Sequence, residues 1–117
     1  MITIQPADKA FLESINAPAD ADAMVLRDSD GTVFGHALFR VVGDTVEVLS
    51  VHTDELLMTE GLIRSVLNTG DCRGAITGVC RDASLAPILK RLEFVEEDGV
   101  YAVSIQNFLY GECKCGG

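Results

Sequence analysis

The chain has 117 residues, which is enough for a single hydrophobic core. Hydrophobic residues make up 48% of the sequence and charged residues 23%, so the composition is that of a globular domain and excludes a disordered chain. The formal net charge of −9 argues against nucleic acid or an anionic membrane as a partner, because both require positive charge to offset phosphate, whereas a cationic amine remains compatible.

The N-terminus has no basic segment followed by an apolar run, and no apolar stretch is long enough to span a bilayer. We therefore expect a cytoplasmic protein whose four cysteines are reduced. Cys80 falls in a predicted interior strand, where a cysteine usually packs as a small hydrophobe. Cys113 and Cys115 supply only half of a tetrahedral zinc site, so we expect no metal.

The first half of the chain predicts a short helix and a three-stranded meander. Residues 2–5 predict a strand and residues 6–15 a helix that must end before Pro18, because the residue before a proline is pushed out of the helical region. Gly43-Asp44 is typical of a two-residue hairpin loop. Three consecutive strands are therefore expected, over residues 23–27, 33–42 and 46–51.

The second half alternates helices and strands. Apolar residues at helical spacing predict a helix that ends near Gly70, and residues 75–80 predict a buried strand. Proline is tolerated only in the first turn of a helix, so Pro87 favours Ser84 as the N-cap of the next helix. The type I′ signal Asp98-Gly99 then predicts a closing hairpin. Its strands are expected over residues 94–97 and 100–105.

This order of elements predicts one mixed sheet of six or seven strands with helices on both faces, which is an α/β domain. We assign the domain to residues 1–107 and a cysteine-containing tail to residues 108–117. The predicted core is drawn from the apolar positions of the strands and helices: Leu49, Val51, Leu62, Val66, Ile76, Ile88, Leu92 and Phe94.

The element order and three stretches resemble the GNAT superfamily of N-acetyltransferases. The stretches are LSV before a loop, GLIRSVL at the opening of a helix, and LKRLEF ahead of a terminal hairpin. The resemblance covers nearly the whole chain and is strongest over residues 33–105. It implies the GNAT-like acyl-CoA N-acyltransferase fold, in which the strands over residues 46–51 and 75–80 are parallel neighbours beside a cofactor gap.

The family's cofactor loop reads Gln or Arg, two residues, Gly, any residue, then Gly or Ala, and its backbone N–H groups bind the pyrophosphate of acetyl-CoA. By resemblance Gly61 takes the first glycine, Met58 the Gln or Arg position, and Ile63 the second small residue. Met58 has no donor, and a β-branched residue crowds a backbone that must approach a phosphate closely. We therefore expect a loop over residues 52–61 that faces the pyrophosphate but binds acetyl-CoA weakly.

The resemblance also implies which residues contact the cofactor. The main chain of Leu49 and Val51 would hold the pantetheine, and Arg64 would restore a cation near the phosphates. The cofactor-binding set is then Leu49, Val51, Gly61, Leu62, Ile63 and Arg64. The plainer interpretation is that Gly61 only eases the entry of a core helix and that Arg64 is solvated.

Catalytic groups are sparse. The tyrosine that commonly protonates the departing CoA thiolate in the family is replaced by Leu89, and the glycine after it by Glu93. The candidate bases are Glu47, the one acid on the strand before the loop, and His52, which follows that strand. Their plainer roles are a surface partner of Arg40 for Glu47 and an exposed loop position for His52.

Two functions from different classes remain open. The first is an N-acetyltransferase that moves an acetyl group from acetyl-CoA to a small-molecule or peptide amine. The second is a catalytically inactive GNAT-like domain that has lost its cofactor loop and serves as a binding or structural module, as a homodimer through its terminal strands. Fold alone does not decide between them.

Overall fold

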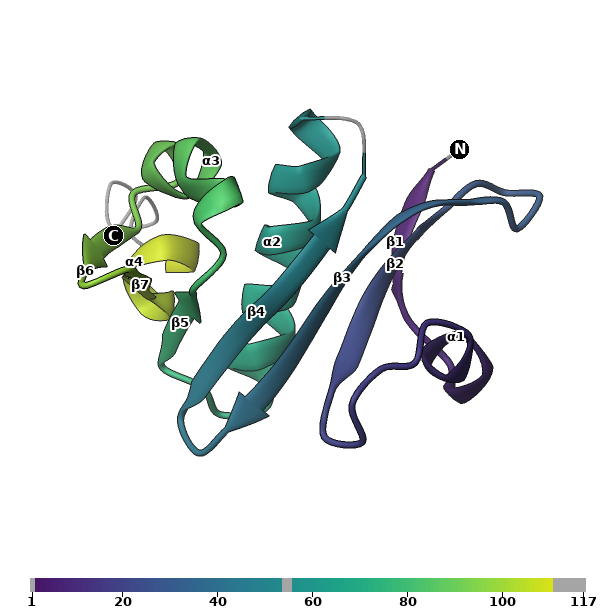
Figure 1. The fold of residues 1–117 in the computed structure, drawn as a ribbon, viewed down its shortest axis with the longest axis horizontal. Coiled ribbons are helices and arrows are strands. Elements are labelled where there is room, and N and C mark those ends of the chain that lie inside the picture. Colours follow the sequence, from purple (N-terminus) through teal and green to yellow (C-terminus); the bar gives the residue numbers. More distant parts are fainter. Residues whose placement is uncertain (1, 54–55, 111–117) are drawn as a thin grey trace.

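The computed structural model describes residues 2–53 and 56–110 of the chain (Figure 1). Its strands are β1 (Thr3–Pro6), β2 (Asp22–Arg27), β3 (Val33–Val42), β4 (Thr45–His52), β5 (Thr77–Cys80), β6 (Val95–Glu97) and β7 (Val100–Ser104). Its helices are α1 (Lys9–Ser14), α2 (Leu56–Cys72), α3 (Ala86–Arg91) and α4 (Ile105–Tyr110), and a 3₁₀ turn, η1 (Ala83–Leu85), precedes α3.

The strands form one seven-stranded sheet in the order β1-β2-β3-β4-β5-β7-β6. β4 and β5 pair in parallel, and the other neighbouring strands of the described residues pair antiparallel. The crossover between the parallel strands is α2, as such a connection requires. The predicted mixed sheet and the predicted parallel pair are both confirmed.

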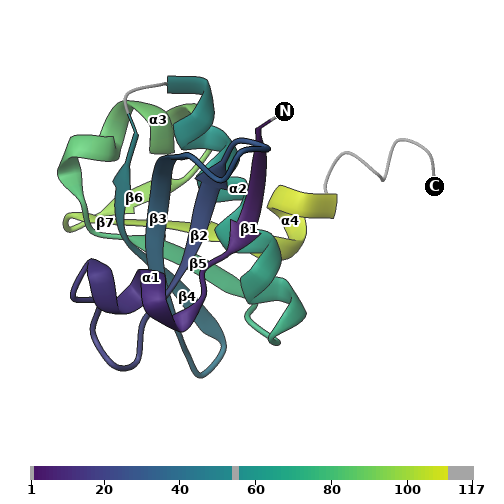
Figure 2. The same ribbon diagram turned by 90° about the vertical axis from the view of Figure 1, so that its right-hand side faces the viewer.

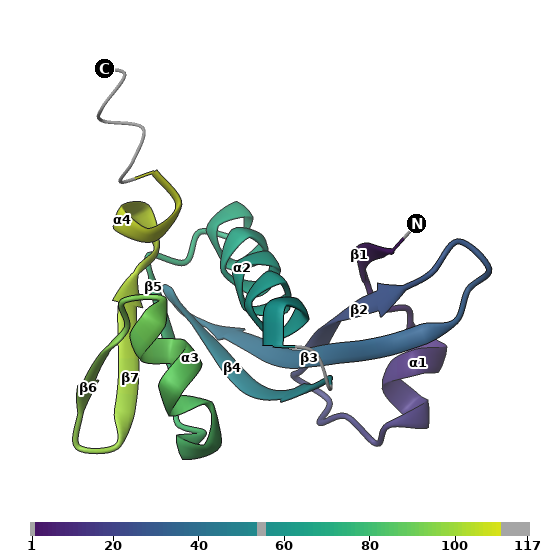
Figure 3. The ribbon, with the colours of Figure 1, turned by 90° about the horizontal axis from the view of Figure 1, so that it is seen from above.

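The helices cover the two faces of the sheet unequally. Figures 2 and 3 show α1 on one side of β2 and β3, and α2 with α4 on the other. α3 belongs to the side of α2, because its Leu89 lies in the same apolar cluster as Leu62 and Leu67 of α2. We call these the helix-covered face, with α2, α3 and α4, and the α1 face.

The core lies on the helix-covered face. Of the predicted core residues, Leu62, Val66, Leu92 and Phe94 are buried, and Val51 and Ile88 are partly buried against the same cluster. Two predictions were wrong. Ile76 is 61% exposed, because it lies before the first residue of β5, and Leu49 is only half-buried.

Leu49 is out of the core because β4 contains a β-bulge. Leu38 pairs with Ser50 while the next residue, Phe39, pairs with Val48, so Leu49 is the extra residue on β4. A bulge bends its strand and shifts the alternation of side chains by one position. Val48 and Val51 therefore lie on the same face although they are three residues apart.

α2 is longer at both ends than the sequence predicted. It begins at Leu56 rather than after Gly61, and it runs past Gly70 to Cys72. Gly70 lies within the helix, where α2 packs closely on β4. A Cβ at this position would lie 2.7 Å from Cγ1 of Val46. The glycine that we took for a helix stop is thus required by packing.

Two smaller expectations were also wrong. Asp82, not Ser84, caps the turn before α3, since Asp82 Oδ1 accepts a hydrogen bond from the Ser84 N–H at 3.0 Å. α1 is shorter than residues 6–15, because Asp8 caps it, accepting from the Phe11 N–H at 2.8 Å. α4 was not predicted, and it runs through the boundary that we placed after residue 107.

Among the described residues, no helix is long and apolar enough to cross a membrane.

Candidate functional site

The parallel strands β4 and β5 separate at their carboxyl ends. Their pairing ends at Val48 and Cys80, whereas β4 continues to His52 and β5 stops. Figure 1 shows β4 leaning away from β5 beyond this point. The bulge at Leu49 lies where the separation begins. The main chain of β4 from Leu49 to Val51 therefore borders an opening between two parallel strands, which is a common place for ligands in α/β sheets.

The residues aligned with the family's phosphate loop do not form a loop. Gly61, Leu62 and Ile63 lie inside α2, where their N–H groups bond to carbonyls four residues earlier. The side chains of Leu62 and Ile63 are fully buried in the core. The expectation of one loop over residues 52–61 was therefore wrong, because the helix takes up most of that stretch.

Gly61 faces β1, which is a strand at one edge of the sheet. A Cβ at this position would meet Cδ1 of Ile4 on β1 at 3.4 Å, which is ordinary contact. Arg64 lies over the ring of Phe108 on α4, with the guanidinium carbon 5.0 Å from the ring centroid. This cation–π contact holds Arg64 against α4.

A different arginine reaches the first turns of α2. Arg91, the last residue of α3, has its Nε 2.6 Å from Oε1 of Glu60, the residue before Gly61. The Glu60 side chain is 15% exposed, and its Oε1 is buried without a hydrogen bond of good geometry among the described residues. Sequence reasoning missed this pair, because the two residues are far apart in the chain and neither takes a defined position in the family patterns.

Two residues near the end of α3 depart from the family pattern, and the structure shows how each is accommodated. Leu89, at the tyrosine position, is fully buried and contributes to the core. Glu93, at the glycine position, has a φ of 69°, the left-handed conformation that favours glycine after a helix. The backbone thus keeps the turn of the family pattern without its preferred residue.

Glu47 lies on the α1 face, enclosed by two arginines. Nε and Nη2 of Arg40 each lie 3.3 Å from its Oε1, and Nη1 of Arg81 lies 2.5 Å from its Oε2. Arg40 also contacts Asp20 at 3.4 Å. The expected pairing of Glu47 with Arg40 is confirmed, and both carboxylate oxygens contact an arginine.

The two histidines stack on each other on the α1 face. His36 and His52 are directly opposite on β3 and β4, and their ring centroids are 4.8 Å apart. The ring of Phe11 on α1 meets His36 edge-on at 5.3 Å. Burial, and then the charge of His52, lowers the pKa of His36. His52 is exposed at the end of β4, beside the opening.

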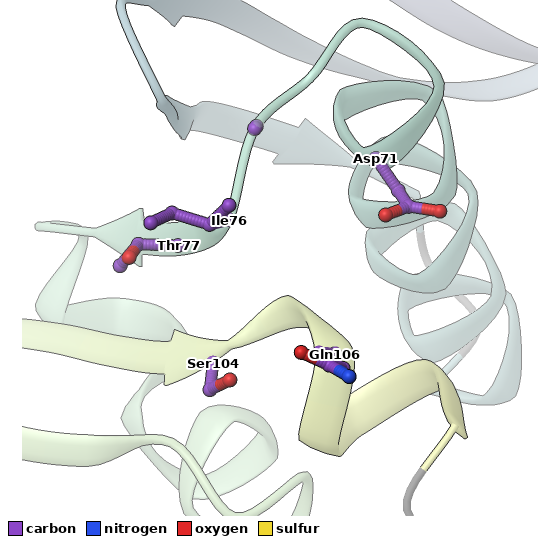
Figure 4. Close-up of a pocket in the computed structure, with 6 residues that line it drawn as sticks. Asp71, Ile76, Thr77, Ser104 and Gln106 are labelled. Atoms are coloured by element: carbon purple, nitrogen blue, oxygen red, sulfur yellow. The ribbon is translucent and has the colours of Figure 1, made fainter.

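Two hollows of the surface lie on either side of β5. One, of about 640 Å³, is on the α1 face and is lined by Arg40, Val42, Thr45, Glu47, Val79 and Arg81. The other, of about 450 Å³, lies between the end of α2, the start of β5 and the junction of β7 with α4, with Asp71, Thr77, Ser104 and Gln106 around it (Figure 4). The second hollow is at the opposite end of β5 from the opening.

Cys80 ends β5 and is fully buried, and burial raises the pKa of its thiol. A protonated, enclosed thiol is a poor nucleophile, as expected for a packing residue. No three or more His, Cys, Asp or Glu side chains gather into a metal-binding group within the described residues. Cys113 and Cys115 lie outside those residues.

Comparison with known proteins identifies the fold. No protein-family profile matches the sequence, and a search of the curated proteins finds no similar sequence. The chain is similar in structure to the ribosomal-protein-S18-alanine N-acetyltransferase of Escherichia coli, with a TM-score of 0.72 and 16% identity over 90% of this chain and 94% of that one.

Two further solved structures agree. A variant of the spermidine N-acetyltransferase of Vibrio cholerae gives a TM-score of 0.73 at 10% identity, covering 95% of this chain and 98% of that one. An acetyltransferase of Bacillus subtilis in complex with CoA gives 0.63 at 10% identity, covering 89% and 99%. The chain therefore has the fold of the GNAT acetyltransferases, as the sequence resemblance implied.

Proposed function

We propose that the chain binds an acyl-CoA in the opening between β4 and β5 and transfers the acetyl group to an amine. The observation that carries this proposal is the separation of the parallel strands at the bulge of Leu49. Unpaired strand main chain can bond to the amide groups of a pantetheine as a neighbouring strand would. Similarity to structures of acetyltransferases, one of them with CoA, supports the same assignment.

In this reaction the amine nitrogen attacks the thioester carbonyl, the new C–N bond forms, and the C–S bond breaks as CoA leaves as a thiolate. The proton of the attacking amine goes to a base. We assign that role to His52 rather than to Glu47, because His52 is exposed beside the opening while two arginines enclose Glu47. Leu89 cannot protonate the thiolate, so water supplies that proton.

Ligand fragments test where the cofactor binds. We expect acetyl-CoA, CoA and pantetheine to raise the melting temperature, because each can pair with the main chain of β4. Adenosine 3′,5′-bisphosphate lacks the pantetheine and should raise it little. A ligand at a hundred times its dissociation constant adds about 2.7 kcal/mol of stability, which is a shift of several degrees for a domain of this size.

Transfer itself is tested by mass spectrometry with amines suggested by the comparisons, namely spermidine and a peptide with an N-terminal alanine. Acetylation that needs the protein and is lost in His52→Gln supports the proposal. No shift with any pantetheine-containing ligand, together with no heat of binding, would refute it.

One observation favours a second candidate, a GNAT-fold domain without catalytic activity. α2 begins at Leu56, so the main-chain donors that the family's loop offers to phosphate are used within the helix at Gly61 and Ile63. A domain that had lost cofactor binding would still need this fold as a scaffold. We would prefer this inactive domain to the acetyltransferase if no pantetheine-containing ligand binds.

A further inference from the structure

We infer that Arg91 of α3 is the cation that binds the diphosphate of the acyl-CoA, and that Glu60 competes with the diphosphate for it. This inference rests on the proposed function. It names the residue that replaces the missing phosphate loop, which neither the sequence pattern nor the family resemblance assigns.

The position of Arg91 is the first argument. The family resemblance implies a diphosphate near the first turns of α2, and Arg91 lies against Glu60 in these turns. α3 ends at Arg91, so the guanidinium extends from the end of one helix to the first turns of another. Arg64, the cation expected from the sequence, is instead held over Phe108.

The availability of Arg91 is the second argument. Its side chain is 54% exposed although its Nε contacts Glu60, so the guanidinium also presents a surface to solvent. A guanidinium has five N–H donors in a planar fork, which matches two oxygens of a phosphate. Arg91 can therefore bind a phosphate group without moving α3.

The state of Glu60 is the third argument. Its Oε1 is buried, and the contact at 2.6 Å with Arg91 is an ion pair rather than a hydrogen bond of good geometry. A buried carboxylate oxygen without a hydrogen bond is unfavourable. The pair is therefore poorly satisfied, and a diphosphate with more negative charge can draw Arg91 away from it. In the absence of ligand, Glu60 keeps a solvent-exposed arginine in place.

Binding measured by calorimetry on the full chain tests the inference, with CoA and pantetheine as probes. We expect Arg91→Gln to weaken CoA binding about tenfold, because one charge-assisted contact is lost, and to leave pantetheine binding unchanged. Glu60→Gln should tighten CoA binding several-fold without tightening that of pantetheine. The affinity of the wild type for CoA should fall with added salt more steeply than its affinity for pantetheine.

Lys90→Gln is the matched control, since it removes one positive charge from an exposed position on the same helix, next to Arg91. CoA binding that is equal in Arg91→Gln and Lys90→Gln would overturn the inference and leave the proposed function intact. The same holds if pantetheine binds as tightly as CoA to the wild type. If neither probe binds any variant, including Glu60→Gln, the proposed function and this inference both fail.

Discussion

The two faces of the sheet are made by alternate residues of the same strands, yet they have different properties. On the helix-covered face Ala37, Phe39, Val46 and Val48 are buried and apolar. On the α1 face the neighbouring positions hold the histidine pair and the chain of contacts from Asp20 through Arg40 and Glu47 to Arg81. Stability is therefore concentrated on one face, while most ionisable groups of the site lie on the other.

The opening between β4 and β5 lies where these two faces meet. It is bordered by main chain from Leu49 to Val51, by core residues such as Cys80 on one side, and by His52 on the other. A ligand there would contact the helix-covered face with its apolar part and the α1 face with its reacting group. This division suggests that substitutions on the two faces can be used to separate stability from function.

The largest contrast is between adjacent residues of β3. Phe39→Ala should lower the free energy of unfolding by about 3–5 kcal/mol, because it leaves a cavity in a fully buried site. Arg40→Gln, one residue along on the other face, should cost about 1 kcal/mol or less, since its ion pairs are partly solvated. Urea unfolding measures both. Equal losses would show that the α1 face contributes as much to stability as the core.

A smaller loss is expected where α2 meets β4. Gly70→Ala places a methyl group 2.7 Å from Cγ1 of Val46, and such overpacking typically costs about 1–3 kcal/mol. The gain in helix propensity, roughly 1 kcal/mol, offsets only part of this cost. Thermal unfolding should show a lower melting temperature. An unchanged or higher value would mean that the helix can move away from the sheet freely.

Gly61→Ala in the same helix should raise the stability, whereas Gly70→Ala lowers it. Its new methyl group would meet only Cδ1 of Ile4, at 3.4 Å, so the gain in helix propensity of up to about 1 kcal/mol should appear as added stability. CoA binding should be unaffected, because the main chain at Gly61 is engaged within α2. A loss of CoA binding in this variant, with stability raised, would restore Gly61 as a phosphate-binding residue.

The smallest expected effect is the change of stability with pH that comes from His36 on the α1 face. The pKa of His36 is lowered by burial and by His52, so the unfolded state binds more protons just below the ordinary histidine pKa of about 6.5. The free energy of unfolding should therefore rise with pH through this window and fall as the pH drops through the lowered pKa of His36.

His36→Gln should flatten this part of the profile, measured by urea unfolding between about pH 5 and 7.5. His52→Gln is the matched variant at the exposed ring of the pair. It removes the charge that lowers the pKa of His36, so it should reduce the slope by less. A profile that keeps its slope in both variants would assign the pH dependence to carboxylates.

The family resemblance implied the parallel pair of strands, whereas the sequence by itself determined the elements from β1 to β7 and their order. These follow from local patterns: alternating apolar residues in the strands, and turns such as Asp98-Gly99, where both residues have positive φ. Helical spacing in the same way identified the buried positions of α2, including Leu62 and Val66. Such patterns need only neighbouring residues, so they can be read without the fold.

The tertiary structure decided the details of the candidate site. The start of α2 depends on the packing of its apolar residues on the sheet, which let the helix replace the stretch that aligns with the family's loop. The bulge at Leu49 exists only through the pairing of β3 with β4. The contact between Glu60 and Arg91 joins two helices that are distant in the chain. Contacts of this kind depend on how elements pack in space, and no local pattern of residues encodes them.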